Sequence, residues 1–286
     1  MKKAFTVGLL PVFIVGMSST HVVAQSESEP ETFGTFTEWC LNQASLSQEA
    51  ARTVEVLLET AETQDCEEAN ATLTALTELD LENRRLSDLS PLANLTNLTD
   101  LDLGTNQISD VSPLTNLTNL TRLTLRRNQI ADISPLANLI NLNELDLTIN
   151  QIADLSSLAS LSRLTVLLAM GNQIVDIAPL ADLSALDFLA LSNNQIADVS
   201  PLANLTNLTW LHLSNNAVQD ISPLVNLIDL RFLYLVDNEI TDVSVLAGLS
   251  LRMLRLSGNP LGDRPCPVPR EGVCTLDVLR NSEESR

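Results

Sequence analysis

The sequence is short of basic residues and of histidine, and each shortage argues against a class of function. It has 36 acidic residues against 16 basic ones, and Lys2 and Lys3 are its only lysines. A net charge of −20 argues against nucleic acid and anionic membranes as partners, since both attract basic surfaces. Histidine occurs only as His21 and His212. Because no nucleophile–base–acid set is recognisable, we expect no enzymatic activity, no cofactor and no resident metal.

Long apolar runs are also missing, apart from one at the N-terminus. Two lysines precede an apolar stretch from Ala4 to Met17, and the small residues Val22-Val23-Ala24 follow. This pattern is typical of a secretory signal peptide over residues 1–24, and the run is too short to span a membrane. We therefore expect an exported, soluble, bacterial protein, periplasmic or extracellular, with a flexible polar leader over residues 25–36.

A pattern of 22 residues fills most of the remaining chain. Its clearest copy, residues 98–108, reads L-T-D-L-D-L-G-T-N-Q-I and is followed by S-D-V-S-P-L. The asparagine recurs with this period at Asn106, Asn128, Asn150, Asn172, Asn194, Asn216 and Asn238. The aspartate of the second half recurs at Asp88, Asp110, Asp132, Asp154, Asp176, Asp198, Asp220 and Asp242. A fixed period of this size indicates a solenoid, and L-x-x-L-x-L-x-x-N-x-I resembles the leucine-rich repeat.

The resemblance covers roughly residues 73–262 and implies an α/β solenoid. We expect a leucine-rich-repeat horseshoe with a parallel concave sheet of about nine strands and 3-10-like convex turns. Alternation such as Leu101-Asp102-Leu103 supports a strand with one buried face in each coil. The domain order is then a helical N-terminal cap over residues 37–75, repeats over 76–262, and a C-terminal cap and tail over 263–286.

The repeated asparagine and aspartate have structural explanations. The buried amide of the asparagine can satisfy backbone groups where the chain turns inward after each strand. Each aspartate can accept hydrogen bonds from the backbone that opens the following Ser-Pro turn. A metal ion held by this row of aspartates is the alternative. On the concave surface, Asp80 beside Asp102 could separately bind calcium through carboxylate oxygens.

Four cysteines predict two disulfides, as is usual for an exported protein. The pair Cys40 and Cys66 and the pair Cys266 and Cys274 lie at opposite ends of the repeat region. A nine-strand stack separates the ends by roughly 40 Å, whereas a disulfide needs Cα atoms about 6 Å apart. We therefore expect Cys40–Cys66 and Cys266–Cys274, each closing one cap. Zinc is the alternative, but His212 lies in the middle of the repeats.

The repeat can be compared with a narrower family. Its spacing of 22 residues, the Asp-Ile/Val-Ser-Pro-Leu turn and the helical cap resemble the internalin-type repeats of exported bacterial proteins. The resemblance implies that the solenoid serves as a surface for binding another protein. The C-terminal sorting signal and the cell-wall module of the internalins are not found in the printed sequence.

The residues expected on the concave surface divide it into two halves. The C-terminal half is apolar and aromatic: Val166, Leu168, Met170, Phe188, Trp210, His212, Phe232, Tyr234, Val236 and Met253. The N-terminal half carries the acidic residues Glu78, Asp80, Asp100, Asp102, Glu144 and Asp146, with Arg122 and Arg126 among them. The same periodicity places the small residues Gly104, Ala190, Ser192 and Ser214 on this surface.

An exposed apolar stripe of this extent usually marks a binding site, and aromatic residues are common interface anchors. The alternative is that aromatic residues simply suit strands, or that part of a cap covers them. We predict a monomeric, non-enzymatic scaffold that binds a protein or peptide on this surface. An envelope or adhesion protein that binds a glycan is the second hypothesis, and a hydrolase is the third.

Overall fold

The structure is a computed structural model that describes residues 33–262, 265–267 and 273–275. These residues belong to one unit, Thr32–Arg286. The predicted signal peptide, most of the predicted leader and most of the C-terminal tail lie outside the described residues. Within the described ranges, no helix combines the length and apolar character needed to cross a bilayer.

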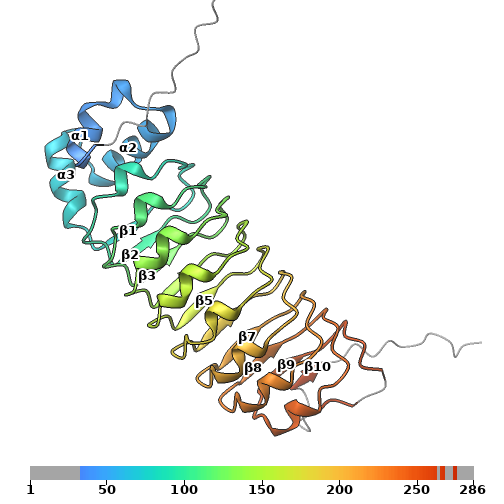
Figure 1. The fold of residues 1–286 in the computed structure, drawn as a ribbon. Coiled ribbons are helices and arrows are strands. Elements are labelled where there is room, and N and C mark those ends of the chain that lie inside the picture. The colour runs from blue at the N-terminus through green and yellow to red at the C-terminus, as the bar shows by residue number, and fades with distance from the viewer. Residues whose placement is uncertain (1–32, 263–264, 268–272, 276–286) are drawn as a thin grey trace, which may run out of the picture. The chain divides into compact units, whose positions relative to one another are not determined.

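Three capped helices form the N-terminal end of the stack (Figure 1). Each begins at a side chain that accepts backbone N–H groups of the first turn: Thr35, Ser47 and Asp65. The Cys40–Cys66 disulfide joins the first helix to the start of the third, with the two Cα atoms 5.6 Å apart. The bounds are α1 (Phe36–Leu41), η1 (Gln43–Ser45), α2 (Gln48–Ala61) and α3 (Cys66–Ala75).

One parallel sheet runs through the described repeats, and its ten strands pair in sequence order. Each repeat coil contributes one strand of three residues to the sheet, and the middle residue of that strand is buried. The sequence predicts about nine strands, and the tenth, at Cys274, continues the sheet into the C-terminal cap. The strands are β1 (Glu78–Asp80), β2 (Asp100–Asp102), β3 (Arg122–Thr124), β4 (Glu144–Asp146), β5 (Val166–Leu168), β6 (Phe188–Ala190), β7 (Trp210–His212), β8 (Phe232–Tyr234), β9 (Met253–Arg255) and β10 (Cys274–Thr275).

A short 3-10 helix returns the chain between consecutive strands from β1 to β9. Six of these helices have Pro at their first or second position, where its missing N–H group leaves no donor unsatisfied. The predicted turns are therefore confirmed. The bounds are η2 (Ser90–Leu92), η3 (Ser112–Leu114), η4 (Ser134–Asn138), η5 (Ser156–Ser160), η6 (Ala178–Leu180), η7 (Ser200–Asn204), η8 (Ser222–Asn226) and η9 (Ser244–Gly248).

The buried asparagines connect successive coils. Asn128 Oδ1 accepts a hydrogen bond from the backbone N–H of Ile108 at 3.0 Å. Its Nδ2 donates to the carbonyl oxygens of Leu103 at 3.0 Å and Leu125 at 2.9 Å. The same arrangement recurs at Asn150, whose Nδ2 also bridges two coils. The structural role predicted for this position is confirmed.

The repeated aspartates open the 3-10 turns. Asp110 Oδ1 accepts the backbone N–H of Ser112 at 2.8 Å, and Asp132 Oδ1 accepts that of Ser134 at the same distance. These backbone hydrogen bonds favour the charged carboxylate and lower the pKa of Asp132, and the equivalent bond lowers that of Asp198. The predicted role of the aspartates in the turn is confirmed.

One backbone position in each coil is left-handed, and the sequence analysis does not anticipate it. The position follows the strand and holds Asn83, Thr105, Arg127, Ile149, Gly171, Asn193, Asn215, Asp237 and Gly258. Ile149 has φ 57°, a conformation that disfavours a β-branched side chain because its Cβ substituents crowd the backbone. Ile149 is therefore a point of backbone strain, and Thr105, the other β-branched residue of this row, has the same conformation with φ 58°.

Candidate functional site on the strand face

The outward residues of β1–β9, together with the position two residues beyond each strand, form one surface, here called the strand face. In most strands the first and third residues are partly or fully exposed while the middle residue is buried. Parallel in-register pairing then sets equivalent residues side by side. Val166 lies beside Phe188, followed by Trp210, Phe232 and Met253. This is the stripe that the repeat periodicity predicts.

Four aromatic residues of this stripe and its neighbouring row, Phe188, Trp210, Phe232 and Tyr234, pack into what we call the aromatic ladder. The Trp210 ring centroid is 4.9 Å from those of Phe188 and Phe232, with interplanar angles of 18° and 28°. Tyr234 stacks on Trp210 at 5.3 Å and 30°. Trp210 therefore lies at the centre of the ladder, and its ring faces are covered by its neighbours while the ladder presents mainly ring edges.

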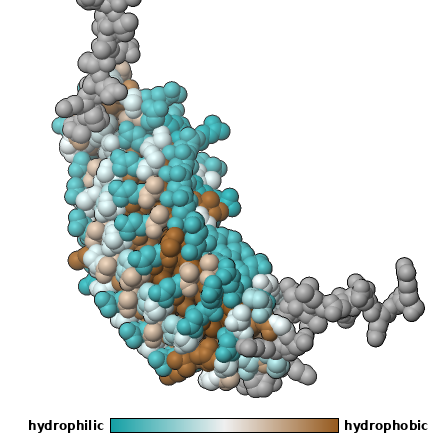
Figure 2. Space-filling view, turned by 45° about the vertical axis from the view of Figure 1, so that its right-hand side comes forward, coloured by the Kyte–Doolittle hydropathy of each residue, from teal (hydrophilic) through white to brown (hydrophobic). Residues whose placement is uncertain are grey.

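This stacking changes how much of the apolar half is exposed. All ten residues predicted for the apolar half are half-buried. The small residues of the same surface are covered: Ala190 is 2% exposed and Ser192 is 2% exposed. Gly104, Ala190, Ser192 and Ser214 occupy the predicted rows of this surface, but all four are buried and add little to its exposed area. On the face shown in Figure 2, apolar surface gathers over the C-terminal half of the stack.

His212 belongs to the aromatic surface. Its ring centroid is 5.0 Å from that of Tyr234, and its pairing partners are Ala190 and Tyr234. Burial lowers the pKa of His212, because the charged imidazolium loses hydration there. The side chain is therefore a neutral imidazole near pH 7, suited to packing and to neutral hydrogen bonding.

The acidic half of the strand face is partly neutralised by two arginines. Arg122 holds Glu144 with two hydrogen bonds of 2.9 and 3.2 Å and reaches Asp100 at 3.2 Å. Arg126 pairs with Glu82 at 2.7 Å. These side chains are 34–52% exposed, and solvent screening limits each pair to about 0–1 kcal/mol of stability.

The remaining carboxylates are engaged locally. Asp80, Asp102 and Asp146 each accept the backbone N–H two residues further on. Partial burial raises the pKa of Asp102, and the negative charges of Glu82 and Asp80 add to this. Among the described residues, no group of three His, Cys, Asp or Glu side chains is arranged to hold a metal ion. Glu78 and Asp80 are exposed, and the other predicted acidic residues are half-buried.

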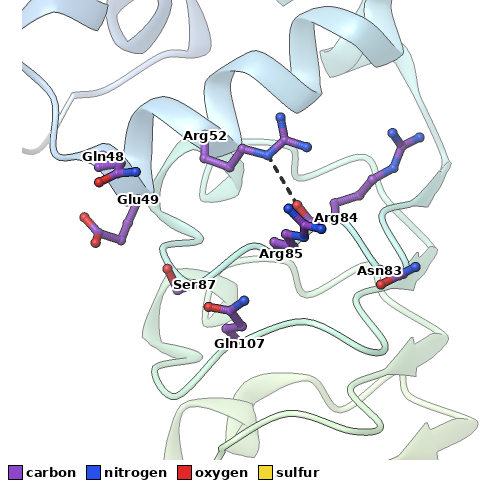
Figure 3. Close-up of a pocket in the computed structure, with 8 residues that line it drawn as sticks. All are labelled: Gln48, Glu49, Arg52, Asn83, Arg84, Arg85, Ser87 and Gln107. Atoms are coloured by element: carbon purple, nitrogen blue, oxygen red, sulfur yellow. Dashed lines mark hydrogen bonds between the residues drawn. The ribbon is translucent and has the colours of Figure 1, made fainter.

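A hollow of about 710 Å³ lies between the cap and the first coil, away from the aromatic ladder (Figure 3). Its lining includes Arg52, Arg84 and Arg85, and Arg52 Nε donates to the backbone carbonyl of Arg84 at 3.3 Å. Two of these arginines are already paired, Arg52 with Glu55 and Arg84 with Glu59. The periodicity does not predict this hollow, because Arg84 occupies the position of the ladder asparagine and breaks the repeat.

Arg255 borders the aromatic ladder and is absent from the residues that sequence reasoning selects. It pairs in the sheet with Tyr234 on one side and Thr275 on the other. Its Nη1 atom is buried and has no hydrogen-bond partner. Two residues earlier, Met253 Sδ accepts a hydrogen bond from the Tyr234 hydroxyl at 2.9 Å. The periodicity places Arg255 outward, but only the side-chain packing reveals its unsatisfied nitrogen.

Comparison with known proteins matches the repeat region. The family model described as "Leucine Rich repeats (2 copies)" matches residues 74–116, 118–160, 162–204 and 206–248. No curated protein matches the chain.

Several solved structures are similar. An internalin (inlF) from Listeria monocytogenes is 42% identical with a TM-score of 0.64, over 66% of this chain and 57% of that one. An internalin C2 (inlC2) from the same species is 36% identical with a TM-score of 0.66, over 78% and 91%. The ectodomain of the plant receptor kinase GASSHO1/SCHENGEN3 from Arabidopsis thaliana, in complex with CASPARIAN STRIP INTEGRITY FACTOR 2, is 30% identical with a TM-score of 0.58, over 63% and 24%. The chain thus spans less than two thirds of the inlF structure.

Proposed function

The chain belongs to the leucine-rich-repeat family and is internalin-like, and from that premise we propose that it binds a protein or peptide through the aromatic half of its strand face. Scaffolds of the internalin and receptor type generally bind proteins. The observation that carries the proposal is the aromatic ladder centred on Trp210. The proposed surface extends from Val166 to Met253 and includes His212. The protein acts there as a non-enzymatic, monomeric scaffold.

The orientation of the rings favours a protein over a glycan. A sugar stacks its apolar C–H face on an open aromatic face. The faces of Trp210 are covered by Phe188 and Phe232, whose centroids both lie 4.9 Å away. The edges and the flanking aliphatic side chains suit the side chains of another polypeptide, which pack into irregular apolar surface. A glycan ligand is therefore the weaker hypothesis.

The two disulfides fit a protein that folds in an oxidising compartment. We place the protein outside the cytoplasm, in the periplasm or in the medium, and the signal-peptide pattern of residues 1–24 supports that placement.

A capture experiment tests the proposal. Oxidised protein lacking residues 1–24 is incubated with extract and culture-medium fractions, beside the double variant Trp210→Glu/Phe232→Glu. The matched control is Val225→Glu/Ile228→Glu, which adds the same two charges at residues that are 50% and 65% exposed, within and just after η8. We expect a protein that the parent and the control capture and the strand-face variant loses. Circular dichroism verifies that all three proteins are folded. Equal capture of the partner by all three would contradict the proposal.

A further inference from the structure

We propose that Arg255 binds a carboxylate of the partner, so that the segment bound on the strand face carries an Asp or Glu side chain beside its apolar anchor. This inference rests on the proposed function and specifies the chemistry of its ligand. The occupant is an extended polypeptide segment whose apolar side chains lie on the aromatic ladder and whose carboxylate lies at the β9 end.

Among the described arginines, only Arg255 has a buried side-chain nitrogen without a hydrogen-bond partner. Arg52, Arg84, Arg122, Arg126 and Arg231 each form an ion pair with a carboxylate. Arg255 is half-buried, its Nη1 atom is enclosed, and its side chain forms no ion pair or hydrogen bond with the rest of the described chain. Arg85, Arg127, Arg163 and Arg252 also lack an ion pair with a described residue, but none of their nitrogens is buried and unpartnered.

A buried guanidinium N–H group without an acceptor is unfavourable, and a carboxylate relieves this with charge-assisted hydrogen bonds. Arg255 is only half-buried as a residue, and a shift of its side chain would bring the enclosed Nη1 within reach of an acceptor on the strand face. The low local dielectric beside Tyr234 and Met253 strengthens such a pair relative to an exposed one.

The sheet register sets the spacing of the two contacts. Arg255 is two strands away from Trp210 and two residues further along its strand. With strands about 4.8 Å apart and about 3.3 Å per residue, the two Cα atoms are separated by roughly 12 Å. An extended segment covers that distance in about three to four residues. The carboxylate therefore belongs to a residue about three to four positions from the one that contacts Trp210.

A preference for an acidic residue in the ligand runs against the net charge of the whole molecule. A protein of net charge −20 repels acidic ligands in general and attracts basic ones. The acidic end of the strand face, with Glu78 and Asp80 exposed, adds to that repulsion. A preference for an acidic residue therefore has to come from a local contact, and Arg255 is the local cation at the aromatic end. The same charge distribution orients the segment, with any basic residues toward β1.

The test uses a random 12-residue peptide library displayed internally on phage and panned against the oxidised protein. Arg255→Gln removes the positive charge. Arg255→Lys keeps the charge but loses the planar guanidinium group, which can donate two parallel hydrogen bonds to a carboxylate. The matched control is Arg252→Gln, which removes the same charge at an exposed residue three positions earlier. Circular dichroism of each variant verifies folding, and Trp210→Ala reports on the apolar anchor.

We expect the parent and Arg252→Gln to enrich peptides with an aromatic or aliphatic residue and, three to four positions away, an Asp or Glu. Arg255→Gln keeps the apolar enrichment and binds the selected peptides at least about tenfold more weakly, while Arg255→Lys loses less. Apolar peptides without excess acid, or an acid preference that survives in Arg255→Gln, would overturn the role of Arg255 alone. Failure of every peptide to enrich, or enrichment unaffected by Trp210→Ala, would overturn the proposed function with it.

Discussion

At the scale of single residues, most of the chain obeys the repeat and a few positions depart from it. Ile149 is the clearest departure, because its left-handed backbone suits Gly or Asn, which occupy the same position at Gly171 and Asn193. The residue is 46% exposed, so only about half of its surface is buried in compensation. The strain at Ile149 therefore lowers the stability of the fold.

Replacing Ile149 by Asn is expected to stabilise the protein by about 1 kcal/mol, since Asn tolerates a positive φ. The measurement is denaturant unfolding of the parent and the variant. The matched control is Ile140→Asn, the same exchange at a residue that is 54% exposed and has no positive φ. The explanation fails if both substitutions change the free energy of unfolding equally.

The ionisation of His212 makes the stability of the folded protein depend on pH. Burial lowers its pKa in the folded protein below the usual 6.5, so the unfolded chain binds more protons in the interval between the two values. This contribution to stability is complete above about pH 6.5 and is lost as the pH falls toward the folded pKa. Unfolding curves of the parent and His212→Gln between about pH 7 and pH 5 should therefore converge as the pH falls. Curves that stay parallel would contradict the assignment.

At the scale of the structural element, each coil depends on its neighbours through the asparagine ladder and the sheet. Asn128 makes three buried hydrogen bonds, and two of them join it to the preceding coil. Removal of the amide leaves the backbone N–H of Ile108 without its acceptor, while the two carbonyl oxygens keep the hydrogen bonds from Asn106 and Asn150. The stack is therefore sensitive to a change at a single residue of this row.

Asn128→Ala should lower the free energy of unfolding by about 1–3 kcal/mol, because the buried N–H group of Ile108 is left without an acceptor. The control is Asn119→Ala, which removes one exposed hydrogen bond to the carbonyl of Thr96 and should change stability by less than about 1 kcal/mol. Chemical denaturation of both variants measures the difference. Similar losses in the two would show that the buried row has no special role.

The elements also show what could be predicted from the sequence. Strands, turns, the buried asparagines and the disulfide pairing follow from a period of 22 residues, because every coil repeats the same local interactions. The stripe from Val166 to Met253 follows from the same register. Departures from the repeat were not predictable in this way. The strain at Ile149, the mutual covering of the aromatic rings and the enclosed Arg255 depend on how neighbouring side chains fill space.

At the scale of the whole molecule, the large negative net charge determines how stability depends on salt. The chain carries −20 at neutral pH, and this self-repulsion opposes the compact state. Cations screen such repulsion, so stability at pH 7 should rise as sodium chloride increases from about 0.02 to about 0.5 M. Thermal unfolding across that range measures the effect. The repulsion account predicts that the rise disappears near the isoelectric point, and an equal rise there would contradict it.

The central claim is that a protein partner occupies the aromatic half of the strand face. The most direct measurement is hydroxyl-radical footprinting of the protein alone and in complex with the captured partner, because aromatic residues and methionine are readily oxidised. We predict that oxidation of Trp210, Phe232, Tyr234 and Met253 falls several-fold in the complex, while Val225 and Ile228, in and just after η8, remain as reactive as in the free protein. Protection of Val225 and Ile228, with the aromatic ladder unchanged, would contradict the claim.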